Sequence, residues 1–220
     1  MTAIVGGTGS GKSTIAKALL RLKDTTKGEI RFLDKPVQCV TQEALRERIS
    51  YVPQKAFLFS GTIRENFLFG KPSATEQEMK QAAEVAQAAA FINTLDGQYD
   101  ALVAQKGNNF SGGQKQRLSI ARALIKPADL YFFDDSFSAL DYQTDAKLRK
   151  ALKSYLQDAA IVIVAQRLST IKDADQIIVL EEGKIVGKGT HEELLRTCKV
   201  YQEFAKSQGM EGKKHEHQAS

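Results

Sequence analysis

The stretch that decides the fold is Gly6-Gly7-Thr8-Gly9-Ser10-Gly11-Lys12-Ser13, which fits the pattern G-x-x-x-x-G-K-[ST] of a phosphate-binding loop. It follows a short apolar run, Thr2 to Val5, and precedes a segment with helical spacing, Ser13 to Leu22. Glycines let backbone N–H groups close around phosphate oxygens, and the helix N-terminus adds partial positive charge. The sequence therefore predicts a nucleotide site over residues 6–14, from Gly6 to Thr14, with Lys12 reaching the β- and γ-phosphates.

A carboxylate at the end of an apolar run supplies the second half of this site. Residues Leu130 to Phe133 form an unbroken apolar run that Asp134 follows directly. Ligands of parallel sheets bind beyond the carboxyl ends of the strands, so Asp134 is expected beside the phosphate-binding loop. There Ser13 and Asp134 are predicted to hold Mg²⁺ from opposite sides. The predicted cofactors are ATP and Mg²⁺.

Composition bounds the remaining possibilities. With 220 residues and 42% hydrophobic content, the chain predicts one α/β domain and, because no long apolar run occurs, a soluble chain. Cys39 and Cys198 lie far apart with no CxxC pattern, which indicates incidental thiols. The net charge of +5 comes from scattered Lys and Arg without interleaved aromatics, which indicates a solvated surface and argues against nucleic acid as a partner.

Several other segments have a clear pattern. Strands are predicted over Glu29–Leu33, Ile49–Val52 and Ile161–Val164, and a hairpin over Gln176–Leu180 and Lys184–Lys188. Thr75 with Glu78, and Thr190 with Glu193, have the spacing of capping boxes, which predicts a helix through about Ala88 and a short one after Thr190. A further helix is predicted to start near Asp141. Residues 209–220 are polar and predict a disordered tail.

The segment Asn109-Phe110-Ser111-Gly112-Gly113-Gln114-Lys115-Gln116-Arg117 precedes another helical pattern. A helix that begins with Ser as its N-cap explains Ser111, but two glycines in the first turn weaken a helix and call for another reason. The segment resembles the LSGGQ signature of ABC ATPases, with Phe110 in the Leu position. Together with the order of the motifs, it identifies residues 1 to about 206 as similar to an ABC transporter nucleotide-binding domain.

This resemblance implies the remaining roles and the architecture. Gln54 matches the Q-loop glutamine, expected at Mg²⁺ and the attacking water. Residues 138–141 match the D-loop, and residues 58–66 look like the exporter segment that faces the membrane domain. The implied fold is a P-loop NTPase, RecA-like, with a mainly parallel sheet flanked by helices, an inserted helical subdomain and an incomplete antiparallel β subdomain. The implied bounds are 1–208 for the domain, with a core of about 1–70 and 126–208 and a helical part of about 71–125.

Two positions depart from the family pattern. The family usually places Glu after the Walker B Asp, and this chain has Asp135, one methylene shorter. The family's switch histidine stands in a segment like AHRLST, and here the run Ala165 to Thr170 has Gln166 in its place. An amide can hydrogen-bond a γ-phosphate but cannot carry the proton of an imidazole. The predicted catalytic residues are Gln54, Asp135 and Gln166. Slow hydrolysis is expected at this site.

The two departures resemble the degenerate half of a heterodimeric, multidrug-type ABC exporter. ABC sites are composite, so Ser111, Gly112, Gly113 and Gln114 are expected to complete the site of a partner nucleotide-binding domain. Residues 102–107 also lack the glutamate of the exporter pattern VGERG. The family's adenine-stacking aromatic lies upstream of the loop strand, so we expect Met1 to be internal to a longer half-transporter, truncated here.

The resemblance places the chain at the cytoplasmic face of the cell membrane, with the transmembrane domains of an exporter as further partners. Two alternatives stay open at this level. One is a soluble ABC ATPase that acts outside transport, although neither a tandem domain nor a coiled-coil insertion is evident. The other is a fragment without function. The transported substrate cannot be read from these residues.

Overall fold

The computed structural model describes residues 1–209, and at its centre lies a sheet in the order β10-β9-β1-β8-β7-β4. Neighbouring strands pair in parallel except β10, which runs antiparallel to β9 at one edge. The strands of this sheet are β1 (Thr2–Gly6), β4 (Ile49–Val52), β7 (Leu130–Asp134), β8 (Ala160–Val164), β9 (Gln176–Glu181) and β10 (Lys184–Gly189). The predicted α/β fold with a mainly parallel sheet is confirmed.

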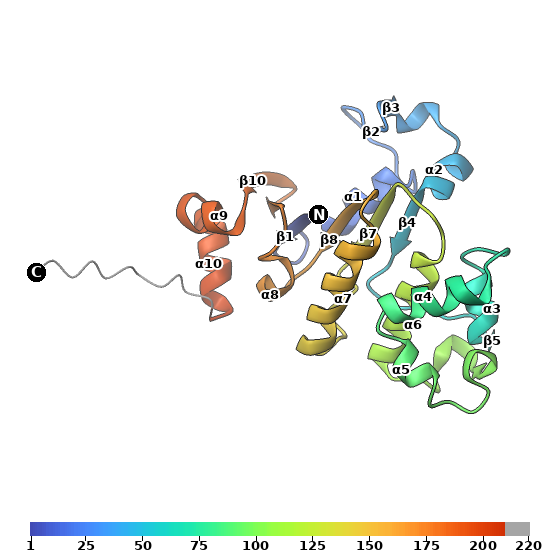
Figure 1. Cartoon of the computed structure of the whole chain (residues 1–220). Helices are drawn as coiled ribbons and strands as arrows, with labels where there is room; N and C mark the ends of the chain where they lie inside the picture. Colours follow the sequence, from blue (N-terminus) through green and yellow to red (C-terminus); the bar gives the residue numbers. More distant parts are fainter. Residues whose placement is uncertain (210–220) are drawn as a thin grey trace, which may run out of the picture.

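Both faces of the sheet are covered, which explains why its inner strands are apolar throughout. Phe132 of β7 packs with Ala16 on one face, whereas Phe133 packs with Leu148 and Leu152 on the other. Successive side chains of a strand point to opposite faces, so an unbroken apolar run needs an apolar partner on each side. Figure 1 shows the helical segments α3 to α6 at the β4 end of the sheet and α9 with α10 at the β10 end.

The helices mostly follow their predicted starts. The α-helices are α1 (Lys12–Leu19), α2 (Gln42–Arg48), α3 (Ile63–Leu68), α4 (Glu76–Val85), α5 (Ala89–Ile92), α6 (Gly112–Leu124), α7 (Tyr142–Tyr155), α8 (Leu168–Ile171), α9 (His191–Thr197) and α10 (Lys199–Ser207). The 3-10 helices are η1 (Val37–Cys39), η2 (Gln98–Asp100) and η3 (Gln105–Gly107). Capping boxes form at the predicted residues Thr75 and Thr190 and also at Ser111.

Two helices end earlier than their apolar patterns predict. The first, α1, stops at Leu19 because Arg21 adopts φ 52° and Leu22 N donates to Lys17 O at 2.8 Å. This is the hydrogen-bond pattern of a Schellman motif, which closes a helix by a left-handed residue. Gln87, with φ 58°, ends α4 in the same way. The sequence does not reveal where these two helices end, because a left-handed residue that ends a helix is usually glycine, and here the residues are Arg21 and Gln87.

Two small antiparallel ladders lie outside the main sheet. β2 (Arg31–Phe32) pairs with β3 (Lys35–Pro36), and β5 (Gly61–Thr62) pairs with β6 (Leu102–Val103). The strand predicted over Glu29–Leu33 shrinks to two residues because Leu33 and Asp34 both have positive φ and form the hairpin turn. Within residues 1–209 no helix is long and apolar enough to cross a membrane. Apart from Gly209, the predicted tail lies outside the described residues.

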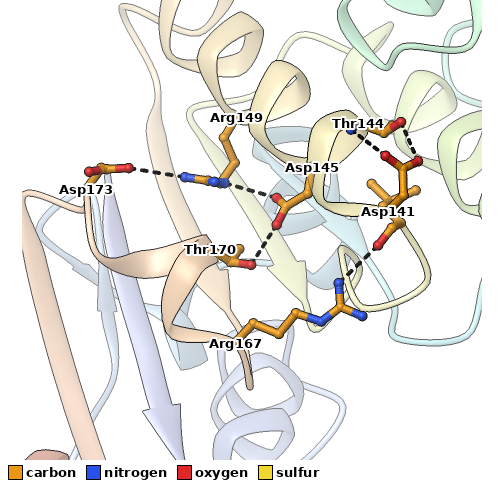
Figure 2. Close-up of polar contacts among 8 residues, drawn as sticks. Asp141, Thr144, Asp145, Arg149, Arg167, Thr170 and Asp173 are labelled. Atoms are coloured by element: carbon orange, nitrogen blue, oxygen red, sulfur yellow. Dashed lines mark hydrogen bonds and ion pairs between the residues drawn. The ribbon is translucent and has the colours of Figure 1, made fainter. Parts of the chain in front are cut away.

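A buried ion pair within α7, Asp145 with Arg149, is hydrogen-bonded to Thr170 of α8 (Figure 2). Asp145 is 1% exposed; it accepts a hydrogen bond from Thr170 Oγ1 at 2.8 Å and one from Arg149 Nε at 3.0 Å. Arg149 also faces the exposed Asp173, at 3.5 Å. Asp145 and Thr170 are each 1% exposed, so the Thr170 hydroxyl depends on Asp145 for its hydrogen bond, and the Asp145 carboxylate depends on Thr170 and Arg149.

We therefore expect Asp145→Ala to lower the free energy of unfolding by about 3 kcal/mol, since it leaves a largely buried guanidinium and a buried hydroxyl without their buried partner. Asp173→Ala, which removes the exposed partner of the same arginine, should cost less than about 1 kcal/mol. Urea unfolding of the two variants beside the parent chain measures the difference. Equal losses would contradict the assignment of Asp145 as the buried anchor.

Candidate functional site

The candidate site is a cavity of about 260 Å³ at the carboxyl ends of the central parallel strands. β1 leads into the phosphate-binding loop, β7 ends at Asp134, and β8 leads to Gln166. Because parallel strands end at one edge of a sheet, these segments meet although they are distant in sequence. The lining residues are Thr8, Gly9, Gly11, Lys12, Ser13, Thr14, Gln54, Asp134, Asp135, Val164 and Gln166. Of these, Val164 was predicted as a strand residue but not as a residue of the site.

The phosphate-binding loop has a conformation that depends on glycine. Gly9 and Gly11 have φ values of 81° and 99°, in the left-handed region that favours glycine. A Cβ on Gly6 would lie 2.2 Å from Leu180 O, so this position also excludes other residues. A Cβ on Gly7 or Gly9 would meet nothing within 4 Å, so the space over these two residues stays open on the cavity side.

The side chain of Lys12 folds back into the phosphate-binding loop. Its Nζ donates to Gly6 O at 2.8 Å, to Gly7 O at 2.7 Å and to Ser10 Oγ at 3.2 Å. Burial lowers the pKa of Lys12, and the nearby carboxylates of Asp135 and Asp134 oppose that shift. The loop carbonyls thus hold a cation next to the cavity, where an anionic phosphate can be received.

Asp134 is held by two hydroxyl groups. Ser13 Oγ donates to Asp134 Oδ1 at 3.1 Å, and Tyr51 OH donates to Asp134 Oδ2 at 3.0 Å. Burial and the neighbouring carboxylate both raise the pKa of Tyr51, so its phenol remains a donor. Tyr51 was not predicted as a site residue. The sequence shows only a tyrosine within the predicted strand β4. The pairing of β4 with β7 brings the Tyr51 hydroxyl to Asp134.

Asp135 accepts from both predicted amides. Gln54 Nε2 and Gln166 Nε2 donate to the same oxygen, Asp135 Oδ2, at 2.9 and 3.0 Å. The backbone of Asp135 has φ 48°, an uncommon value for a residue with a side chain, and its N–H donates to Val164 O. Burial raises the pKa of this carboxyl, while the hydrogen bond from Gln54 lowers it. The three predicted catalytic residues are therefore assembled in one chain.

The signature residues lie elsewhere. Ser111 caps α6: its Oγ accepts from Gln114 N at 3.3 Å, and Gln114 Oε1 accepts from Ser111 N at 2.9 Å. Neither these two residues nor Gly112 and Gly113 line the cavity described above. The structure thus brings the phosphate-binding loop, Gln54, both aspartates and Gln166 together, and leaves the signature segment on another part of the surface.

The residues of the cavity fit a nucleotide phosphate with Mg²⁺. Glycine backbone, a buried lysine and a helix N-terminus suit phosphate oxygens. Ser13 and Asp134 offer a hydroxyl and a carboxylate, which are the hard oxygen ligands that Mg²⁺ prefers. Within residues 1–209 no group of three or more His, Cys, Asp or Glu could hold a metal. Mg²⁺ needs only one or two carboxylates, because phosphate and water supply its other ligands.

Comparison with known proteins places this geometry in context. Residues 1–138 match the family model described as ABC transporter. An uncharacterised ABC transporter ATP-binding protein of Mycobacterium tuberculosis is 50% identical over 95% of this chain and 36% of its own length. The ATP-dependent lipid A-core flippase of Desulfotalea psychrophila is 42% identical over 91% of this chain and 35% of its own length.

Among solved structures, a bacterial Atm1-family ABC exporter with ATP bound matches with a TM-score of 0.92. It is 39% identical, and the match covers 96% of this chain and 37% of that chain. The chain thus spans about a third of the length of these relatives.

The Tyr51 hydroxyl gives a test of this site. We expect Tyr51→Phe to raise the Mg²⁺ concentration needed for half-maximal nucleotide binding by about 10-fold, because it releases the carboxylate that is predicted to hold the metal. Tyr142→Phe makes the same chemical change at an exposed position and should have no effect. Titration of Mg²⁺ at fixed ATP, followed by calorimetry, measures both. An unchanged Mg²⁺ requirement in Tyr51→Phe would contradict the role given to this hydroxyl.

Proposed function

This chain belongs to the ABC transporter family, and we propose that it is the ATP-binding domain of an exporter of that family. In this proposal it binds MgATP and pairs with a second nucleotide-binding domain, so that ATP binding and hydrolysis drive transport across a membrane. The observation that carries the proposal is the cavity in which the phosphate-binding loop, Asp134, Gln54 and Gln166 meet. The exporter named among the solved structures supports the direction of transport.

We assign the parts of this domain from the contacts. Residues 1–70 and 126–208 form the core with the phosphate-binding loop, and residues 71–125 form the helical part with the signature segment. Lys12 receives the β- and γ-phosphates, and Thr14, at the start of α1, lines the same cavity. Ser13, Gln54 and Asp134 hold Mg²⁺, which when bound neutralises phosphate charge and orients the γ-phosphate.

Hydrolysis at this site is proposed to be slow. A general base must reach the attacking water with its carboxylate, and Asp135 is one methylene shorter than glutamate. Its Oδ2 already accepts two amide hydrogen bonds, from Gln54 and Gln166. Gln166 can donate a hydrogen bond to a phosphate oxygen, but its amide cannot take up or release a proton near neutral pH. The chain thus favours binding of ATP over turnover.

The signature segment is proposed to act on the site of a partner. Ser111 and Gly112 are exposed at the N-terminus of α6, a helix of 13 residues. A Cβ on Gly112 would meet nothing within 4 Å, so the packing of this chain does not require a glycine there. A ligand or backbone that approaches from outside the chain would require it. A heterodimer follows if the partner carries the catalytic residues that this chain has lost.

An aromatic surface suits contact with the membrane domains. Phe57, Phe59 and Phe69 are 46%, 40% and 62% exposed. The rings of Phe57 and Phe59 meet edge to face at 5.1 Å between centroids, and those of Phe59 and Phe69 are tilted at 4.3 Å. Phe59 and Phe69 line a groove between α2 and α6 that also contains Arg122, whose guanidinium lies 5.4 Å from the Phe59 ring. Exposed aromatic and Arg residues beside a groove are typical of protein interfaces. The location that goes with this proposal is the cytoplasmic face of the membrane, where this surface would meet the membrane domains.

The first test restores the family residues at the two altered positions. We expect Asp135→Glu combined with Gln166→His to raise MgATP turnover of the purified chain by about 100-fold, because the longer carboxylate reaches the water and imidazole can carry a proton. Turnover is measured at matched protein concentration with ATP affinity determined in parallel. If the parent chain already turns over as fast as the revertant, the site is not degenerate.

The second test asks whether the site is shared between two chains. In the revertant, Gly112→Asp should abolish turnover without changing ATP affinity or thermal stability, because the new side chain meets only open space within its own chain. Lys12→Ala should instead abolish ATP binding. Mixing the two inactive variants should restore turnover, since one chain supplies the loop and the other the signature. A mixture that stays inactive, with both variants folded, would contradict a composite site.

A further inference from the structure

The loop that carries Gln166 is held from the far end of the chain. Gln208 Nε2 donates to Gln166 O at 2.6 Å, and Leu168 N donates to Gln208 Oε1 at 2.9 Å. One carboxamide thus pairs with a backbone carbonyl and a backbone N–H two residues apart, in the way that a neighbouring strand would. Both bonds are made to the backbone, so they do not depend on which side chain stands at position 166.

Gln208 itself is fixed by the packing of α10. Tyr201 and Ala205 of this helix are 0% and 1% exposed, and Tyr201 OH lies 2.8 Å from His191 Nδ1 of α9. The helix ends at Gln208, where Gly209 turns with φ 68° and its N–H donates to Lys206 O. Figure 1 shows the C-terminal end of α10 near α8. The Gln208 carboxamide is therefore carried by a helix that is packed against the rest of the domain.

The same loop reaches in the opposite direction. Arg167 Nη1 donates to Leu140 O at 3.0 Å, and Arg167 Nη2 donates to Ser138 O at 2.8 Å. Figure 2 shows this guanidinium extending toward the start of α7. Segment 138–141 begins three residues after Asp135, and Ser138 Oγ donates to Asp135 O at 2.8 Å. Loop 166–168 therefore lies between α10 on one side and segment 138–141 on the other.

We propose that Gln208 is a positioning residue for the nucleotide site. By holding the backbone at 166 and 168, it fixes where the side chain of residue 166 stands over the cavity and where Arg167 holds segment 138–141. Displacement of α10 would then move both elements together. The consequence for turnover rests on the proposed function, whereas the clamp itself does not.

Hydrogen exchange without nucleotide tests the clamp. Gln208→Ala should speed exchange of the Leu168 amide by about 10-fold. That amide loses its acceptor, and the loop also loses the hydrogen bond from Gln208 to Gln166 O. The Leu140 amide should exchange about 3-fold faster, through the weakened hold of Arg167. The control is Gln202→Ala on the same helix, which removes one exposed side-chain bond, to Leu195 O, and should change neither amide. Arg167→Ala should affect Leu140 but not Leu168.

Turnover in the Asp135→Glu, Gln166→His background tests the consequence. Adding Gln208→Ala should lower kcat by about 5-fold with little change in KM, as expected of a group that orients a catalytic residue. Adding Gln202→Ala should leave kcat unchanged. Unchanged exchange at Leu168 and Leu140 would overturn the proposal, and faster exchange with unchanged kcat would overturn the positioning role. A background without turnover would instead contradict the proposed function and leave the exchange result to decide the clamp.

Discussion

The parallel pairing of β1, β8 and β7 is the constraint on which the rest of the structure depends. These three strands end at one edge because they run in the same direction, although β1 lies more than a hundred residues before β7 and β8 in the sequence. Each strand is apolar on both faces because helices cover the sheet on both sides. The phosphate-binding loop, the two aspartates and Gln166 are carried to that edge as a result. Nothing in the local sequence of any one segment would bring them together.

Asp135 shows how closely the site residues are coupled. It sits at a left-handed backbone position directly after β7, and its Oδ2 accepts from an amide that follows β4 and from one that follows β8. A carboxylate with two amide donors is stabilised in place and is at the same time less free to orient a water. Position 166 belongs in turn to a loop held by Arg167 and Gln208, so a change at either end of that loop reaches the carboxylate through one hydrogen bond.

Helix α6 joins two surfaces that the proposed function needs. Its N-terminus presents the signature segment, and Arg122 near its C-terminus donates to Phe57 O at 2.7 Å beneath the exposed aromatic surface. In between, Gln116 is 2% exposed and donates to Pro53 O, next to Gln54. In the proposed function, α6 would connect the signature segment to the groove, because both lie on one continuous helix of 13 residues.

Local sequence patterns predicted the α/β fold class, the phosphate-binding loop, the aspartate at the end of an apolar strand and the starts of the capped helices, because these depend on residue types at fixed local spacing. They could not reveal Tyr51 at Asp134, the sharing of Asp135 between two glutamines or the hold of Gln208 on residues 166 and 168. Those contacts join residues 31 to 83 positions apart. They exist only because strand pairing and helix packing bring their backbones within reach, so the tertiary structure alone decided them.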